Sequence, residues 1–195
     1  MNHIPLILLF VYSCFTMNLV LQCGLGLRGI AESKSAMNVQ AFAKLGLVFL
    51  TVILIWFFFS NVIFSLFSGI FIYVLLFPVS AIVYDGLEYL TFQYLLKRSR
   101  EEETFISFPG CITAVAVFIC INMANGFLDV LILSFGFTSG IFIISLITRE
   151  IRKRAALEAV PVFLRGKPLV LIAMGMLSLI FTAASYLFFR MISAG

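Results

Sequence analysis

The chain has 195 residues, of which 63% are hydrophobic and only 11% are charged. A soluble domain of this size is roughly half apolar and a quarter charged, so the composition excludes an ordinary soluble domain and indicates an integral membrane protein. The 23 phenylalanines suit helices that face lipid, and the placement of the charges matters more than their net value of +4.

The first apolar stretch, about Ile4–Cys23, predicts a helix that crosses a bilayer and then meets three glycines, Gly24, Gly26 and Gly29. Glycine loses the most backbone entropy in a helix and tolerates turns that other residues cannot make, so we expect this helix to break at about Gly24. Irregular backbone at membrane depth persists only when it is buried in protein or lines a wet cavity. The polar residues beside the break, which mark it as the first place to look for function, are Asn18, Gln22 and Arg28.

Six apolar stretches have about the length that a bilayer needs, which is roughly 20 residues. They are about Ile4–Cys23, Ala41–Phe64, Gly69–Leu96, Phe105–Asn122, Phe127–Ile147 and Pro168–Phe189. Two of the connectors between them carry no charge. The other three carry twelve of the 13 Lys and Arg residues: Arg28, Lys34, Lys44, Lys97, Arg98, Arg100, Arg149, Arg152, Lys153, Arg154, Arg165 and Lys167. The positive-inside rule makes that side cytoplasmic, so we expect a multi-pass membrane protein with both termini outside.

The spans divide into two halves of three, residues 1–100 and 101–195, within a single membrane domain. The first helix of each half is interrupted, at Gly24–Gly29 in one and at Pro109-Gly110 in the other, because proline removes a backbone donor. Three spans per half require the halves to cross in opposite senses. The predicted fold is therefore all-α, with six transmembrane helices in two inverted three-helix repeats and with helices one and four interrupted.

Few acidic residues lie in or near the predicted spans, and three polar residues are candidates for an ion path. They are Asn18, Glu88 and Asp129. An intramembrane carboxylate is a functional candidate by default. The structural alternatives are that Glu88, like Asp85, reaches water or pairs with a nearby Lys or Arg, and that Asp129 begins a helix. The run Glu101–Glu103 has the alternative of a solvated loop that neutralises its basic neighbours.

All four cysteines, Cys14, Cys23, Cys111 and Cys120, lie inside apolar runs, and no CxxC pair is present. Each is expected to be a small buried hydrophobic residue rather than part of a disulfide framework. Small residues recur at helical spacing in the last two spans and predict close helix packing. They are Gly136, Ser139, Gly140, Gly175 and Ser178.

Four stretches carry a resemblance to a known family. Residues 159–168, AVPVFLRGKP, look like a "VP-x-x-FRG-x-P" connector, and 171–181, LIAMGMLSLIF, resemble a "LITAGLLSLAF" last helix. Residues 136–138 with Arg149-Glu150 resemble "GFT…IRE", and 18–27 resemble "NNFVLV-x-x-LGLC". The chain thus resembles, over nearly its whole length, the small six-helix membrane subunits of the Rnf and Na⁺-translocating NADH:quinone reductase (Nqr) complexes, of the RnfA/NqrE type.

The resemblance implies a partner subunit of opposite orientation, RnfE/NqrD-like, and other Rnf/Nqr subunits. In that family one cysteine from helix one and one from helix four of each partner hold a shared [2Fe–2S] cluster, since such clusters bind thiolates. Here Arg28 and Val115 occupy the two ligand positions. We therefore expect no cofactor in this chain. Two alternatives are a displaced cluster held by Cys23 and Cys111, and a fixed positive charge supplied by Arg28, which is otherwise an interfacial cytoplasmic arginine.

The function that follows is a subunit of an ion-translocating NADH or ferredoxin:acceptor oxidoreductase complex, serving as scaffold or ion-path half. The chain has no glycine fingerprint for a nucleotide, so NADH oxidation is not expected to occur in it. One alternative is a stand-alone small-solute transporter or channel-like protein of inverted-repeat type. Another is a membrane-assembly factor, which the replaced ligands favour.

Overall fold

The computed structural model describes residues 6–24, 39–59, 71–91, 93, 109–157, 161 and 166–194. Every regular element in these ranges is helical, which confirms the predicted all-α class. The elements are α1 (Leu6–Val11), η1 (Tyr12–Thr16, a π-helix), α3 (Val39–Phe58), α5 (Phe71–Leu90), α6 (Pro109–Met123), α7 (Phe127–Leu157) and α8 (Lys167–Ala194). They follow the predicted spans in order.

Two helical stretches in the described ranges are long and apolar enough to cross a membrane. They are Phe127–Ala155 of α7 and Lys167–Leu187 of α8. The segments Leu6–Thr16, Ala43–Phe58 and Gly110–Met123 are apolar but shorter than this criterion requires. By length and composition the structure thus provides two candidate membrane spans.

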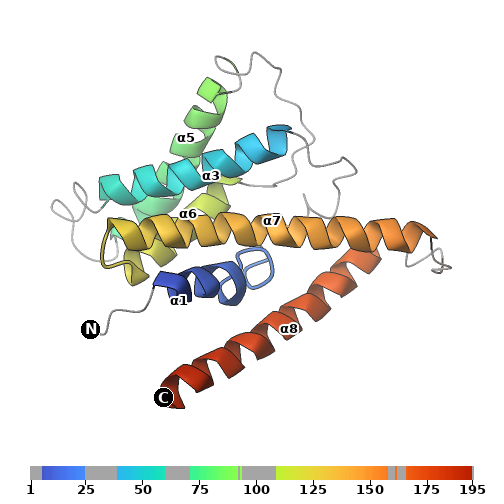
Figure 1. Ribbon diagram of the computed structural model, residues 1–195. Coiled ribbons are helices and arrows are strands. Elements are labelled where there is room, and N and C mark those ends of the chain that lie inside the picture. Colours follow the sequence, from blue (N-terminus) through green and yellow to red (C-terminus); the bar gives the residue numbers. More distant parts are fainter. Residues whose placement is uncertain are drawn as a thin grey trace.

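Helices α3 and α7 lie side by side at the centre of the molecule and run in opposite directions (Figure 1). Helix α5 extends to one side of this pair and α8 to the other (Figure 1). The buried core is formed mainly by α3, α6 and α7. Its members include Val48, Val52, Ile112, Ala116, Val117, Leu133, Phe137 and Ile141. Helix α8 adds Val170 and Met174 near its start, and most of its remaining described side chains are exposed.

The helix contacts follow a common pattern in the two halves of the chain. The first segment, α1 with η1, packs against α7, as α6 packs against α3. Likewise η1 contacts α8 as α6 contacts α5, and α3 contacts α5 as α7 contacts α8. Exchanging the first three segments for the last three therefore preserves these pairs. The contact of α6 with α7 has no counterpart among the more extensive contacts of the described helices.

The first helix ends earlier than the glycines predict. After Val11 the backbone widens into η1, whose last hydrogen bond runs from the Met17 N–H to the Tyr12 carbonyl at 2.9 Å. The regular helix thus stops at Thr16, eight residues before Gly24, which corrects both the continuous span Ile4–Cys23 and the position of the break. Gly24 directly follows the turn at residues 19–23 and has a positive φ of 68°. Arg28, Gly26 and Gly29 lie outside the described residues.

Two other boundaries differ from the prediction. Helix α7 continues ten residues beyond the predicted end at Ile147, so Arg149 and the basic residues 152–154 stand on a helix rather than in a loop. Helix α6 begins at Pro109, where a missing N–H costs nothing because the first turn of a helix has no intrahelical acceptor for it. Residues 105–108, the start of the predicted fourth span, lie outside the described part, as do Glu101–Glu103.

Candidate functional site

The buried amide of Asn18 terminates the first helix. Its Nδ2 donates to the Cys14 carbonyl at 3.0 Å, and its Oδ1 accepts the N–H groups of Val20 at 3.1 Å and Leu21 at 3.3 Å. The side chain is 1% exposed. It thereby satisfies backbone groups on both sides of the point where the helical ladder stops, which is the condition for irregular backbone in an apolar interior.

Helix α7 fits closely against this segment because two of its residues are glycines. A Cβ at Gly140 would lie 2.7 Å from the Cys14 carbonyl oxygen and 2.8 Å from Asn18 Nδ2, and one at Gly136 would overlap the Ser13 hydroxyl. Between them, the Ser139 hydroxyl lies 3.5 Å from the Cys14 sulfur. The predicted packing role of these small residues is confirmed. Gly175, by contrast, has open space around it, so its predicted packing role is wrong.

Helix α8 contacts the turn that follows Asn18. The Ser178 hydroxyl donates to the Leu21 carbonyl at 3.2 Å, which agrees with the predicted role of Ser178 in packing. The Gln22 amide donates to the Thr182 hydroxyl at 3.0 Å, and this pair is exposed. Asn18 and Gln22, predicted together as polar residues beside the break, thus face α7 and α8 respectively. The broken first helix is held between the last two helices of the chain.

Glu88 forms a buried ion pair with a lysine of another helix. Its Oε1 lies 3.4 Å from Nζ of Lys44, which is in the second turn of α3. The two residues are 3% and 8% exposed. Pairing with Lys or Arg was one of the alternatives that the sequence left open for this carboxylate. Asp85, one turn earlier on α5, is exposed.

Asp129 has a local structural role at the start of α7. Its Oδ2 accepts the backbone N–H of Asn125 at 3.0 Å, which holds the turn between α6 and α7. This is the helix-start alternative. Along α7, Asp129 lies eleven residues from Gly140 and hence about 17 Å from the point where Asn18 packs. The three predicted ion-path residues, Asn18, Glu88 and Asp129, therefore have separate partners and do not form one site.

The four cysteines divide into two buried and two exposed. Cys14 and Cys120 are buried, as predicted, whereas Cys23 and Cys111 are exposed and correct the prediction that all four lie buried. Cys23 directly follows Gln22, which bonds to α8, and Cys111 directly follows Gly110, whose backbone lies close to Ala81 of α5. Since α8 and α5 extend to opposite sides of the central pair (Figure 1), these two thiols belong to different helix contacts.

One of the two ligand positions implied by the family resemblance lies in the described part of the chain. Val115, at one predicted ligand position, is a half-buried aliphatic side chain packed against the core, and it cannot ligate iron. Arg28, at the other, lies outside the described part. Within the ranges that the structure describes, no three His, Cys, Asp or Glu side chains are grouped to hold a metal ion.

Lys44 was assigned from the sequence to a cytoplasmic connector, and its partnership with Glu88 was missed. The signal was present, because Lys44 lies inside the predicted second span between apolar neighbours, Ala43 and Leu45. A lysine one or two turns into an apolar helix requires a partner or a route to water. Thr182 had no comparable signal, since a threonine in an apolar helix commonly bonds its own preceding turn.

No known protein-family model matches the chain, and no curated protein matches it. The fold and the contacts above, together with the sequence, therefore carry the functional argument.

Proposed function

We propose that the chain is a membrane subunit of an Rnf/Nqr-type ion-translocating electron-transport complex, without an iron–sulfur cluster of its own. It crosses the bacterial inner membrane six times as two inverted three-helix halves. It pairs with an RnfE/NqrD-like subunit and acts as scaffold or as one half of an ion path. The sequence resemblance in residues 159–181 suggests the family.

The observation that carries the proposal is the shared pattern of helix contacts. An inverted repeat requires that exchanging the halves preserve the helix neighbours, and the pairs α1–η1 with α7 and α6 with α3 meet this requirement, as do α3–α5 and α7–α8. The opposite directions of α3 and α7 agree with it (Figure 1). Helix α5, with 20 residues, has about the length of a span, and the apolar part of α3, Ala43–Phe58, is somewhat shorter.

The broken first helix supports a role in transport. Discontinuous helices mark the binding region at the repeat interface of many transporters, and π-helical turns are frequent at functional sites. Asn18 lies at such a break, between α7 and α8. We therefore keep Asn18 as the first ion-path candidate.

The proposal is tested by purifying the tagged chain from its native membranes in a mild detergent. The expected result is co-purification of several membrane subunits, including a paralogue of this chain, with bound flavin. A second preparation from cells that express the Gly140→Leu variant is the control, because a bulky side chain at Gly140 disrupts the contact with η1 and should release the partners.

The same broken helix also supports a second function, a stand-alone transporter of a small solute. Recovery of the chain alone or as a homodimer, free of flavin, would favour this second function over the complex. Growth and electron transport that persist after deletion of the gene, with assembly merely slowed, would favour the assembly factor.

A further inference from the structure

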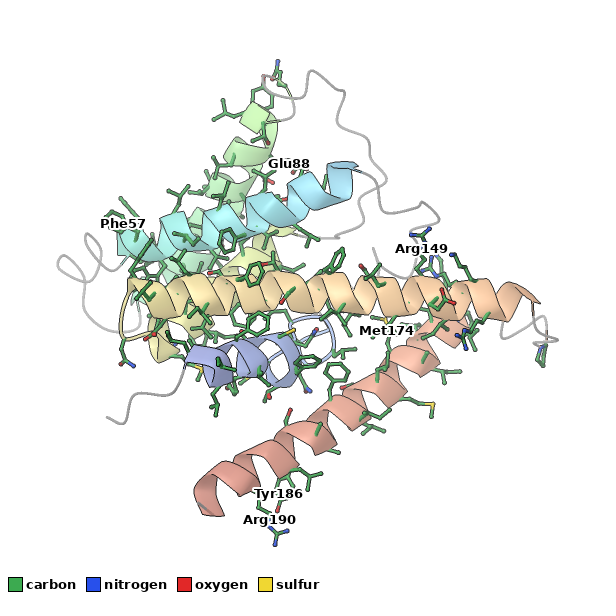
Figure 2. The ribbon with its side chains drawn as sticks, viewed as in Figure 1. Phe57, Glu88, Arg149, Met174, Tyr186 and Arg190 are labelled. Atoms are coloured by element: carbon green, nitrogen blue, oxygen red, sulfur yellow. The ribbon has the colours of Figure 1, made fainter. Side chains whose placement is uncertain are left out.

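The ion pair between Lys44 and Glu88 joins α3 to α5. Lys44 is followed on α3 by the buried Leu45, Leu47 and Val48, and Nζ lies 3.4 Å from Oε1 of Glu88. Figure 2 shows Glu88 next to α3, toward the end of α5. Both residues are buried, Lys44 near the start of α3 and Glu88 near the end of α5.

Stability alone does not explain a buried pair of this kind. Removing two charges from water is energetically costly, and apolar residues of similar volume commonly stabilise such an interface as well or better. Apolar contacts between α3 and α5 are already present in the shared core, to which both helices contribute. A carboxylate kept in such a place requires a cation beside it, and this chain supplies the cation from its own α3.

We propose that the Lys44 ammonium occupies a monovalent-cation site at Glu88, so that a tethered charge stands where a free cation would otherwise bind. An ammonium and a small alkali cation both neutralise a buried carboxylate, and both accept oxygen ligands.

A consequence follows for ion movement. Because Lys44 is covalently attached, the site is permanently filled, and Glu88 does not exchange ions with the solvent in the natural chain. Glu88 then drops out of the ion path. This inference concerns the isolated chain and holds whether or not the chain belongs to an electron-transport complex.

The test measures thermal unfolding of the purified full-length chain in detergent, in sodium chloride and in choline chloride of equal ionic strength. The natural chain is expected to unfold at the same temperature in both salts. Lys44→Ala is expected to unfold about 5–10 °C lower in choline, because Glu88 loses its ammonium partner, and to recover with a saturable dependence on sodium. Lys44→Ala combined with Glu88→Gln is the matched control and should respond equally to both salts.

Two results would overturn the proposal. One is a saturable sodium dependence of the natural chain that Glu88→Gln abolishes, since a free cation would then bind despite Lys44. The other is a Lys44→Ala variant that responds to sodium no more than the double variant does.

Where Lys44→Ala folds in neither salt, the charge-exchanged pair Lys44→Glu with Glu88→Lys decides between two readings. If the charge-exchanged double variant folds and Lys44→Ala stays unfolded in sodium, the natural ion pair only stabilises the contact between the two helices. That result would reject a cation site. Recovery of the single variant Lys44→Met in sodium but not in choline would support the site.

Discussion

A single amide, that of Asn18, satisfies three backbone groups where the first helix stops, and it does so from a position that is almost entirely buried. The same residue is packed against Gly140, so the break and the close approach of α7 depend on one another. A larger residue at Gly140 would displace the amide, and loss of the amide would leave the turn without partners. The break is therefore a built feature of the interior.

Replacing Asn18 tests this dependence. In Asn18→Ala the Val20 and Leu21 N–H groups and the Cys14 carbonyl each lose a partner, and each buried polar group left unpaired costs about 1–3 kcal/mol. The chain should therefore lose a large part of its stability, as measured by unfolding in detergent. Asn122→Ala is the control: Asn122 also donates to a carbonyl four residues earlier, Phe118, but it is exposed and should change stability by less than about 0.5 kcal/mol.

Two glycines provide a second test at this scale. Gly140→Ala places a Cβ 2.7 Å from the Cys14 carbonyl and should destabilise the chain by about 1–3 kcal/mol through overpacking. Gly175→Ala meets nothing within 4 Å, and should be neutral or stabilise the chain by up to about 1 kcal/mol through helix propensity. Both are measured as changes in unfolding temperature. Equal effects at the two positions would contradict the close approach of α7 to η1.

Among the helices, α7 contacts more of the other elements than α8 does. It contacts the first segment, α3, α6 and α8, whereas α8 is held mainly through its first half, by Val170, Met174 and the Ser178 hydroxyl. Figure 2 shows Met174 close to α7 and Tyr186 far along the diverging part of α8. The docking of α8 should therefore depend on a few side chains near its start.

Two methionines on α8 allow that dependence to be measured. Met174 is 3% exposed and Met176 is 62% exposed. Met174→Ala should loosen α8, with a loss of about 2–4 kcal/mol and faster hydrogen exchange in α8, because the cavity forfeits packing contacts. Met176→Ala should leave both quantities nearly unchanged. Faster exchange in Met176→Ala than in Met174→Ala would mean that α8 docks through its other face.

The order and the approximate positions of the helices could be predicted from the apolar runs, but their ends could not. Hydropathy locates where apolar residues stop, and α7 continues past Ile147 because Arg149 and its basic neighbours are good helix formers. The early end of the first helix was missed because Gly24 was the stronger local signal. The helix ends where the Asn18 side chain accepts a hydrogen bond from the Val20 backbone N–H. A hydropathy pattern does not reveal such a hydrogen bond.

The candidate site was likewise predictable only in part. The acidic candidates were found because carboxylates are rare in apolar stretches, whereas the pairing of Glu88 with Lys44 joins residues on separate helices and depends on how α3 meets α5. The close contact at Gly136 and Gly140 was predicted from spacing alone, and its partner, the π-helical turn, was not. Residue types were thus predictable, and most of their partners were not.

For the whole molecule, the decisive question is how many helices cross the membrane. The described helices include two, α7 and α8, that are long and apolar enough by themselves, whereas the proposed inverted repeat requires six crossings. With two crossings or with six, the α6–α7 turn and the basic end of α7 lie on opposite sides of the membrane. The two arrangements differ in the side that the connector before α6 occupies.

Single cysteines in a variant that lacks the four natural ones separate the two arrangements. With six crossings, Asn125→Cys should react with a membrane-impermeant maleimide in intact spheroplasts, whereas Ser99→Cys and Lys153→Cys should react only after permeabilisation, since the basic connectors stay in the cytoplasm. With two crossings, Ser99→Cys would react together with Asn125→Cys. That second pattern would remove the inverted repeat. Because the shared contact pattern of the two halves would then have no topological cause, the proposed subunit function would lose its main support.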